Sequence, residues 1–181
     1  MMAKVAGGIA GIAAGLCWLV KSTVILVTGW QPPVIFELAP LLMSIAALGL
    51  TYHLPIGRSR TVARLTAVAG FAASTAALVD VAAELPRHVT GGGIALATVL
   101  ILLSLIVSGI VLWPRMRWTL PLVIGVMTMP AVLVGGLLAA MFGERFLEVP
   151  LVALGAAWVA FGGNLLQGRY AAETKRKSRV R

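Results

Sequence analysis

Two long apolar stretches without any charged side chain constrain the fold of this chain more than any other feature. No Asp, Glu, Lys or Arg lies between Val89 and Pro114, or between Trp118 and Gly143. A helix that crosses a hydrocarbon core of about 30 Å needs about 20 mostly apolar residues. Each stretch meets that length, so the sequence predicts two membrane-spanning helices here.

Four further apolar segments extend this prediction to six spans. The chain has 60% hydrophobic and 12% charged residues, whereas a soluble domain has about 45–50% and about 25%. This composition excludes an ordinary soluble fold, and the high hydrophobicity excludes a disordered chain. We predict an all-α, polytopic membrane bundle in residues 1–168, with six transmembrane helices at residues 5–28, 34–54, 61–84, 92–113, 119–142 and 146–167.

The positions of the basic residues predict the side of the membrane on which each terminus lies. Of the Lys and Arg residues, only Arg87 and Arg145 fall on one predicted side of the membrane, and Lys21 lies within the first span. Because cytoplasmic loops carry an excess of Lys and Arg, we place both termini in the cytoplasm and the chain in the cell membrane. The basic residues on that side are Lys4, Arg58, Arg60, Arg64, Arg115, Arg117, Arg169, Lys175, Arg176, Lys177, Arg179 and Arg181.

Residues 169–181 form a basic tail directly after the last predicted span. Basic residues next to the cytoplasmic leaflet attract anionic lipid, so we expect the bilayer to be the partner of this tail. The net charge of +9 does not indicate nucleic-acid binding, because the short connectors leave no domain that could read a groove.

The chain lacks the residues that the common membrane enzymes require. Cys17 is the only cysteine, which excludes a disulfide or a CxxC redox pair within the chain. His53 and His88 fall at opposite predicted membrane faces, so they cannot share a metal or a haem. Asp80 is the only aspartate, which excludes a paired-aspartate protease. We therefore expect no catalytic residues, no metal site, no cofactor and no enzymatic activity.

Three ionisable residues within the outer halves of the predicted spans form the candidate site. These are Lys21, Glu37 and Asp80. A charge within a span costs about 2.5–3.5 kcal/mol on insertion scales and usually faces the bundle interior. We expect Lys21 to reach Glu37 or Asp80, either as a site for a ligand or ion or as a structural ion pair. Glu84, Glu144 and Glu148 are interpreted as acids that reach the outer interface.

Small residues predict which helices pack together. Gly7, Gly11 and Gly15 repeat every four residues on the first span, a pattern that lets helix backbones approach closely. The glycines serve either the packing of this chain or a membrane protein partner. We expect the first, second, third and sixth spans to form the packed core. The fourth span, rich in Leu, Ile and Val, is expected to face lipid.

Two prolines are predicted within spans, beyond the first helical turn. Proline has no N–H to donate to the carbonyl four residues earlier. Pro40 would release the carbonyl of Phe36, next to Glu37, and Pro130 would release that of Val126. We expect both prolines to kink their helices, and the freed carbonyls are candidates to coordinate a cation or a donor.

Two functions are compatible with these residues. The first is a small transport or solute- and ion-binding module whose polar site lies in the outer half of the bilayer. The second is an accessory or structural subunit of a larger membrane complex, docked through the first helix. The six-span architecture, with small residues on the first helix, is similar to that of the substrate-binding subunits of energy-coupling-factor transporters. No binding motif of that family is present.

Overall fold

The described part of the chain is a bundle of helices. The computed structural model describes residues 2–32, 34–83, 87–114 and 119–170, and at residues 34, 35 and 87–91 it describes the backbone only. No strand occurs in these ranges. The elements are α1 (Met2–Thr28), η1 (Val34–Leu38), α2 (Ala39–Thr51), α3 (Arg58–Ala82), α4 (Arg87–Leu112), α5 (Leu120–Phe142), η2 (Glu144–Leu147) and α6 (Glu148–Leu166), where η marks a 3-10 helix.

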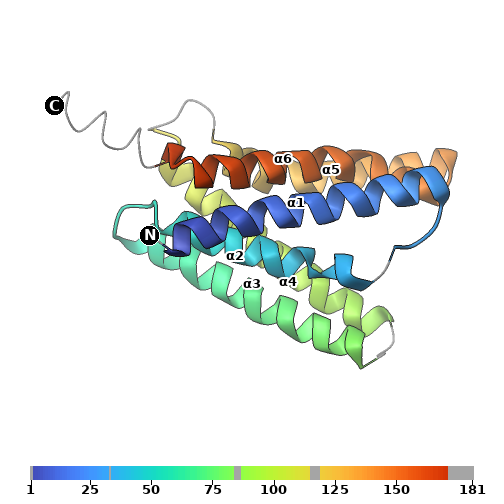
Figure 1. Cartoon of the computed structure of the whole chain (residues 1–181), viewed down its shortest axis with the longest axis horizontal. Helices are drawn as coiled ribbons and strands as arrows, with labels where there is room; N and C mark the ends of the chain where they lie inside the picture. The colour runs from blue at the N-terminus through green and yellow to red at the C-terminus, as the bar shows by residue number, and fades with distance from the viewer. Residues whose placement is uncertain (1, 33, 84–86, 115–118, 171–181) are drawn as a thin grey trace.

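The helices run up and down along one common direction (Figure 1). The start of α1 and the end of α6 lie at the same end of the bundle, which we call the terminal end; the opposite end is the distal end. α1 packs most extensively against α6, and α3 packs most extensively against α4. α2 lies against α1, α3 and α4, so it occupies the middle of the bundle.

Within the described residues, five helices are long and apolar enough to cross a membrane. They cover Met2–Thr28, Arg58–Ala82, Gly92–Leu112, Leu120–Phe142 and Glu144–Leu166, and a shorter apolar helix covers Phe36–Thr51. The prediction of an all-helical chain with long apolar helices is confirmed, and these helices are those of a multi-pass membrane protein. Some expectations fall outside the described residues: the tail beyond Tyr170, Arg115, Arg117, Glu84 and the His88 side chain.

The second predicted span differs from a continuous α-helix. Its α-helical part, α2, has 13 residues, which extend about 20 Å at 1.5 Å per residue. The five residues of η1 precede it and add about 10 Å at 2 Å per residue. The two elements together therefore reach about 30 Å, the thickness of a hydrocarbon core.

Glycines on α1 allow close contacts with two neighbouring helices. A Cβ placed on Gly7 would lie 2.7 Å from the Cα of Gly49 on α2. A Cβ on Gly15 would lie 2.6 Å from the carbonyl oxygen of Gly155 on α6. Between them, a Cβ on Gly11 would lie 3.0 Å from the Cα of Gly162 on α6. The glycines of α1 thus lie in contacts within this chain.

The expectation that the fourth span faces lipid is wrong. The apolar segment of α4 is 39% buried, the highest value among the five long apolar helices, whereas those of α3 and α5 are each 22% buried. Ala97, Leu105 and Ser104 on α4 are fully buried, and the Ser104 hydroxyl donates to the carbonyl of Ala63 on α3 at 2.7 Å. Apolar composition did not reveal this contact, because lipid tails and protein interiors are similarly apolar.

Candidate functional site

One ion pair joins α1 to η1 in the distal half of the bundle. The Lys21 ammonium donates a hydrogen bond to Oε1 of Glu37. Their side chains are 22% and 32% exposed, and no other ion pair joins residues in the described ranges. The 3-10 turn of η1 places Glu37 beside α1. Since each charge would be costly alone within a membrane, the pairing stabilises both residues at this depth.

Asp80 does not join this pair. It lies two residues before the end of α3, at the distal end, and its side chain is half-buried. Within the described part of the chain, Asp80 has no hydrogen bond and no ion pair. Of the two partners expected for Lys21, the structure therefore selects Glu37, and the three candidates do not form a single cluster.

A very small cavity lies beside Glu37. Pro40 of α2, Ser74 and Ala77 of α3 and Ile94 of α4 also line it, and the space open to the centre of a water molecule is about 10 Å³. A cavity needs about 10–15 Å³ on this measure to hold one water. The space is thus large enough for a water molecule or a bare ion, but too small for an organic solute.

Buried hydroxyl groups continue from this cavity into the bundle. Ser44 and Ser74 are almost fully buried, and their hydroxyl oxygens lie 3.5 Å apart. Each is also anchored to its own helix: Ser44 donates to the carbonyl of Pro40 at 3.0 Å and Ser74 to that of Gly70 at 2.8 Å. Polar groups therefore line the contact between α2 and α3 below Glu37.

The two candidate prolines lie in different settings. Pro40 is in the first turn of α2, so the expected kink within a continuous helix is wrong: a 3-10 helix precedes α2, and first-turn proline is tolerated. Pro130 does lie inside α5. It is exposed, as is Val126 with 46% of its surface. A group that met the Val126 carbonyl would therefore come from outside the bundle.

A larger cavity opens at the distal end, where α1 and α5 stop and α6 begins. Its volume is about 330 Å³, and Ile25, Gly29, Gln31, Glu144, Arg145 and Glu148 are among the residues that line it. Gly29 has φ of 69° and Gly143 has φ of 108°, backbone conformations that glycine adopts without strain. These two residues end α1 and α5 and so leave space above the start of α6.

Glu148 is the main functional candidate that the sequence did not reveal. It is the first residue of α6, only 9% of it is exposed, and it lines the distal cavity. Among the residues that the structure describes, none forms a hydrogen bond or an ion pair with the Glu148 carboxylate; its backbone N–H donates to the carbonyls of Arg145 and Phe146. Its neighbour Arg145 lies over the ring of Phe146 at 5.4 Å instead. Glu148 is therefore a largely buried residue whose carboxylate is not paired with a cation among the described residues.

The sequence contains a weak signal for the position of Glu148 at a helix start. Pro150 follows it by two residues, and proline near a helix start marks Glu148 as a first-turn residue. A carboxylate in the first turn is stabilised by the helix dipole. Glu148 lines one cavity together with η2 and the end of α1, however, and no local pattern in the sequence specifies this arrangement.

One buried histidine lies at the terminal end, outside the helices. His53 is 8% exposed, and neither ring nitrogen has a hydrogen bond to the described residues. Its ring lies 6.1 Å from that of Tyr170. Burial and the nearby Lys4 charge lower the pKa of His53 to about 4. The imidazole is therefore neutral at pH 7.

The donor groups in the described ranges do not gather into a metal site. No set of three or more His, Cys, Asp and Glu side chains comes together there. No family model, no curated protein and no solved structure matches the chain. The similarity of architecture to the energy-coupling-factor subunits therefore gains no support from these comparisons.

Proposed function

We propose that this multi-pass membrane protein is a small transport or binding module for a positively charged solute or ion, which enters through the distal cavity. The observation that carries the proposal is Glu148, a nine-tenths buried residue whose carboxylate has no described partner and which lines a cavity of about 330 Å³. Binding pockets for small molecules have volumes of about 300–1,000 Å³, so the cavity is large enough for a small solute.

The charges around this cavity favour a cation. Glu144 and Glu148 contribute two carboxylates and Arg145 one guanidinium, so the wall carries an excess negative charge when both acids are ionised. A buried charge is costly unless it is paired. A bound cation would supply the partner that Glu148 lacks, and Gln31 at the rim offers an amide oxygen for hydrogen bonds.

The Lys21–Glu37 pair lies one turn of α1 from the distal cavity. Ile25 lines the distal cavity, and Lys21 lies one helical turn below it on the same face of α1. A cation that moves inward from Glu148 would compete with Lys21 for Glu37. The space of about 10 Å³ beside Glu37 restricts this deeper step to a small ion or a proton carried on water.

The orientation in this proposal follows from the basic residues. Lys4, Arg58, Arg60, Arg64 and Arg169 all lie at the terminal end of the bundle. The positive-inside rule assigns that end to the cytoplasm of a cell-membrane protein. The distal cavity then faces the outside, where it can capture solute.

An accessory-subunit role is less well supported by the contacts of α1. The glycines expected to dock a partner, Gly7, Gly11 and Gly15, pack against α2 and α6 of the same chain. These glycines already form contacts within the chain and so offer no free surface to a partner helix. We accordingly favour the binding module and propose no catalytic step for it.

A binding experiment with a matched control tests this proposal. The full chain in nanodiscs is titrated with Na⁺, K⁺, Mg²⁺, guanidinium and ethylammonium at constant ionic strength, and the shift in thermal unfolding is measured. We expect at least one cation to stabilise the wild type and the Asp80→Asn variant, but not Glu148→Gln. Both variants replace a carboxylate with an amide, yet Asp80 does not line the distal cavity. Equal shifts in all three proteins would contradict the proposal.

A further inference from the structure

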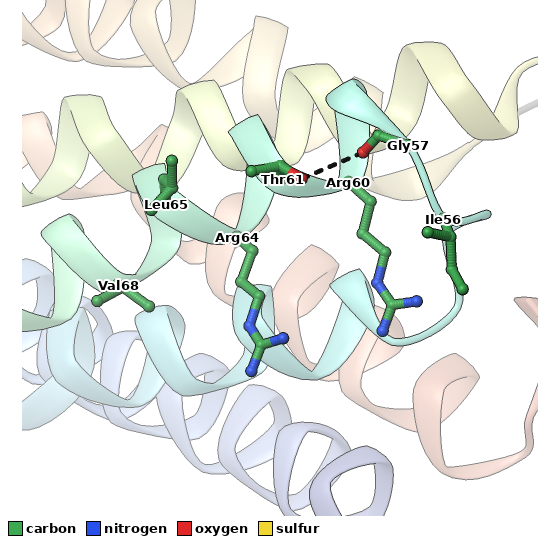
Figure 2. Close-up of a pocket in the computed structure, with 7 residues that line it drawn as sticks. All are labelled: Ile56, Gly57, Arg60, Thr61, Arg64, Leu65 and Val68. Atoms are coloured by element: carbon green, nitrogen blue, oxygen red, sulfur yellow. Dashed lines mark hydrogen bonds between the residues drawn. The ribbon is translucent and has the colours of Figure 1, made fainter.

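A groove at the terminal end carries two arginines that are not neutralised. It lies along the first turns of α3, and Ile56, Arg60, Arg64, Leu65 and Val68 are among the residues that line it (Figure 2). Its volume is about 420 Å³. The groove is far from the distal cavity, so an inference about it does not rest on the proposed function.

The two guanidinium groups are held together by one tyrosine. Figure 2 shows the side chains of Arg60 and Arg64 extending from α3 in the same direction. Their Cζ atoms lie 5.8 and 5.3 Å from the centroid of the Tyr52 ring. Nη2 of Arg64 also donates to the Tyr52 hydroxyl at 3.3 Å. Cation–π contacts at such distances are attractive, so Tyr52 keeps both like charges within reach of the same ring.

No carboxylate neutralises these charges in the described part of the chain. The only ion pair there is Lys21–Glu37, in the distal half. The sequence has no acidic residue between Glu37 and Asp80, and both of these acids lie toward the distal end. The start of α3 contributes the positive end of its helix dipole at Arg58. Among the described residues, the charges in this corner therefore have the same sign.

We propose that this groove binds the phosphate of an anionic phospholipid headgroup. Guanidinium groups match the oxygens of a phosphate with paired hydrogen bonds, and Arg60 and Arg64 would share one phosphate between them. The headgroup would lie over the first two turns of α3, at the level of the membrane surface.

Apolar side chains next to the arginines favour a lipid over free phosphate. Arg60, Arg64 and Val68 follow one face of α3 at four-residue spacing, so an apolar position follows the two charges as the helix runs into the bundle. Val68 is 48% exposed and its neighbour Leu65 is 62% exposed. An acyl chain would cover these two side chains, whereas inorganic phosphate would leave them bare.

Lipid titration of the purified full chain tests this site. Delipidated protein is titrated with phosphatidylglycerol or phosphatidylcholine at fixed ionic strength, and bound lipid is counted by native mass spectrometry. We expect the wild type to prefer phosphatidylglycerol by about tenfold or more. The Arg60→Gln/Arg64→Gln variant should bind one phosphatidylglycerol fewer, while the basic tail at residues 169–181 keeps its own attraction for anionic lipid. Arg58→Gln is the matched control, because Arg58 is exposed on the same first turn but does not line the groove.

Two further arms keep the test decisive. The Arg60→Lys/Arg64→Lys variant preserves both charges and guards against misfolding; it should bind phosphatidylglycerol several-fold more weakly, because ammonium groups lack the planar fork. Inorganic phosphate at millimolar concentration should not displace the lipid. Displacement by phosphate would overturn the lipid assignment. An unchanged number of bound phosphatidylglycerols in the double Gln variant, or an equal loss in Arg58→Gln, would overturn the site itself.

Discussion

A single added methyl group at Gly162 should separate α1 from α6. A Cβ at this position would lie 2.4 Å from the backbone nitrogen of Ile12 and 2.6 Å from the carbonyl oxygen of Gly8. Ordinary van der Waals contact begins at 3.4 Å, so the helices must move apart by about 1 Å. Both obstacles are backbone atoms, which cannot rotate away. This contact belongs to the most extensive helix pair in the bundle.

Two opposing effects set the magnitude for Gly162→Ala. Replacing glycine with alanine within a helix favours the helix by about 0.8–1 kcal/mol. Overpacking of a tight interface typically costs about 1–3 kcal/mol and occasionally more. Because rigid backbone lies opposite, we expect the upper part of this range and a net loss of about 2 kcal/mol.

The adjacent glycine provides the control. A Cβ on Gly163, in the same helical turn, would meet nothing within 4 Å, so Gly163→Ala should be neutral or slightly stabilising. Both variants are unfolded in mixed micelles by increasing SDS, with helicity followed by circular dichroism. The packing argument is refuted if Gly162→Ala is as stable as Gly163→Ala.

The remaining predictions concern one ion pair and one histidine. Lys21→Met should destabilise the protein by about 2–3 kcal/mol, since it leaves the partly buried Glu37 without a cation. Adding Glu37→Gln should restore most of this loss, and an additive double variant would show that the pair is not coupled. The pKa of His53 is lowered to about 4 in the folded state, against about 6.5 in the unfolded chain. The fold therefore favours the neutral imidazole, and this contribution to the free energy of unfolding is present above pH 6.5 and is lost as the pH falls toward 4. Between pH 6.5 and 4.5 the wild type should lose about 2–3 kcal/mol more than His53→Gln, and parallel thermal unfolding curves for the two proteins would contradict this.

The fold class could be predicted because membrane crossing demands long apolar helices. The charge-free runs around Ser104 and Thr128 predicted two membrane-spanning helices, and they form α4 and α5 in the structure. The side on which each helix packs was harder to predict. Ser104 lies in a buried contact with α3, but its Leu- and Ile-rich neighbours look the same to lipid and to protein.

The candidate site could be predicted only in part. Lys21 and Glu37 were identifiable because charges within spans seek partners, and they do pair. Asp80 satisfied the same rule, yet it does not join the pair. The depth of a residue along its helix can be read from the sequence, but the neighbouring helix that its side chain faces cannot. Glu148 was interpreted as an interface acid, and the cavity that it lines also includes Gly29 at the end of α1, which is far away in sequence.

Cysteine accessibility tests the central claim that the distal cavity opens on the side opposite the start of α1 and the end of α6. In a Cys17→Ser background, Gln31→Cys places a thiol at the rim of the distal cavity, and Ser59→Cys places one at the start of α3; both positions are exposed. A membrane-impermeant maleimide applied to intact cells should label Gln31→Cys at once and Ser59→Cys only after permeabilisation. Labelling of both thiols from the same side would contradict the account.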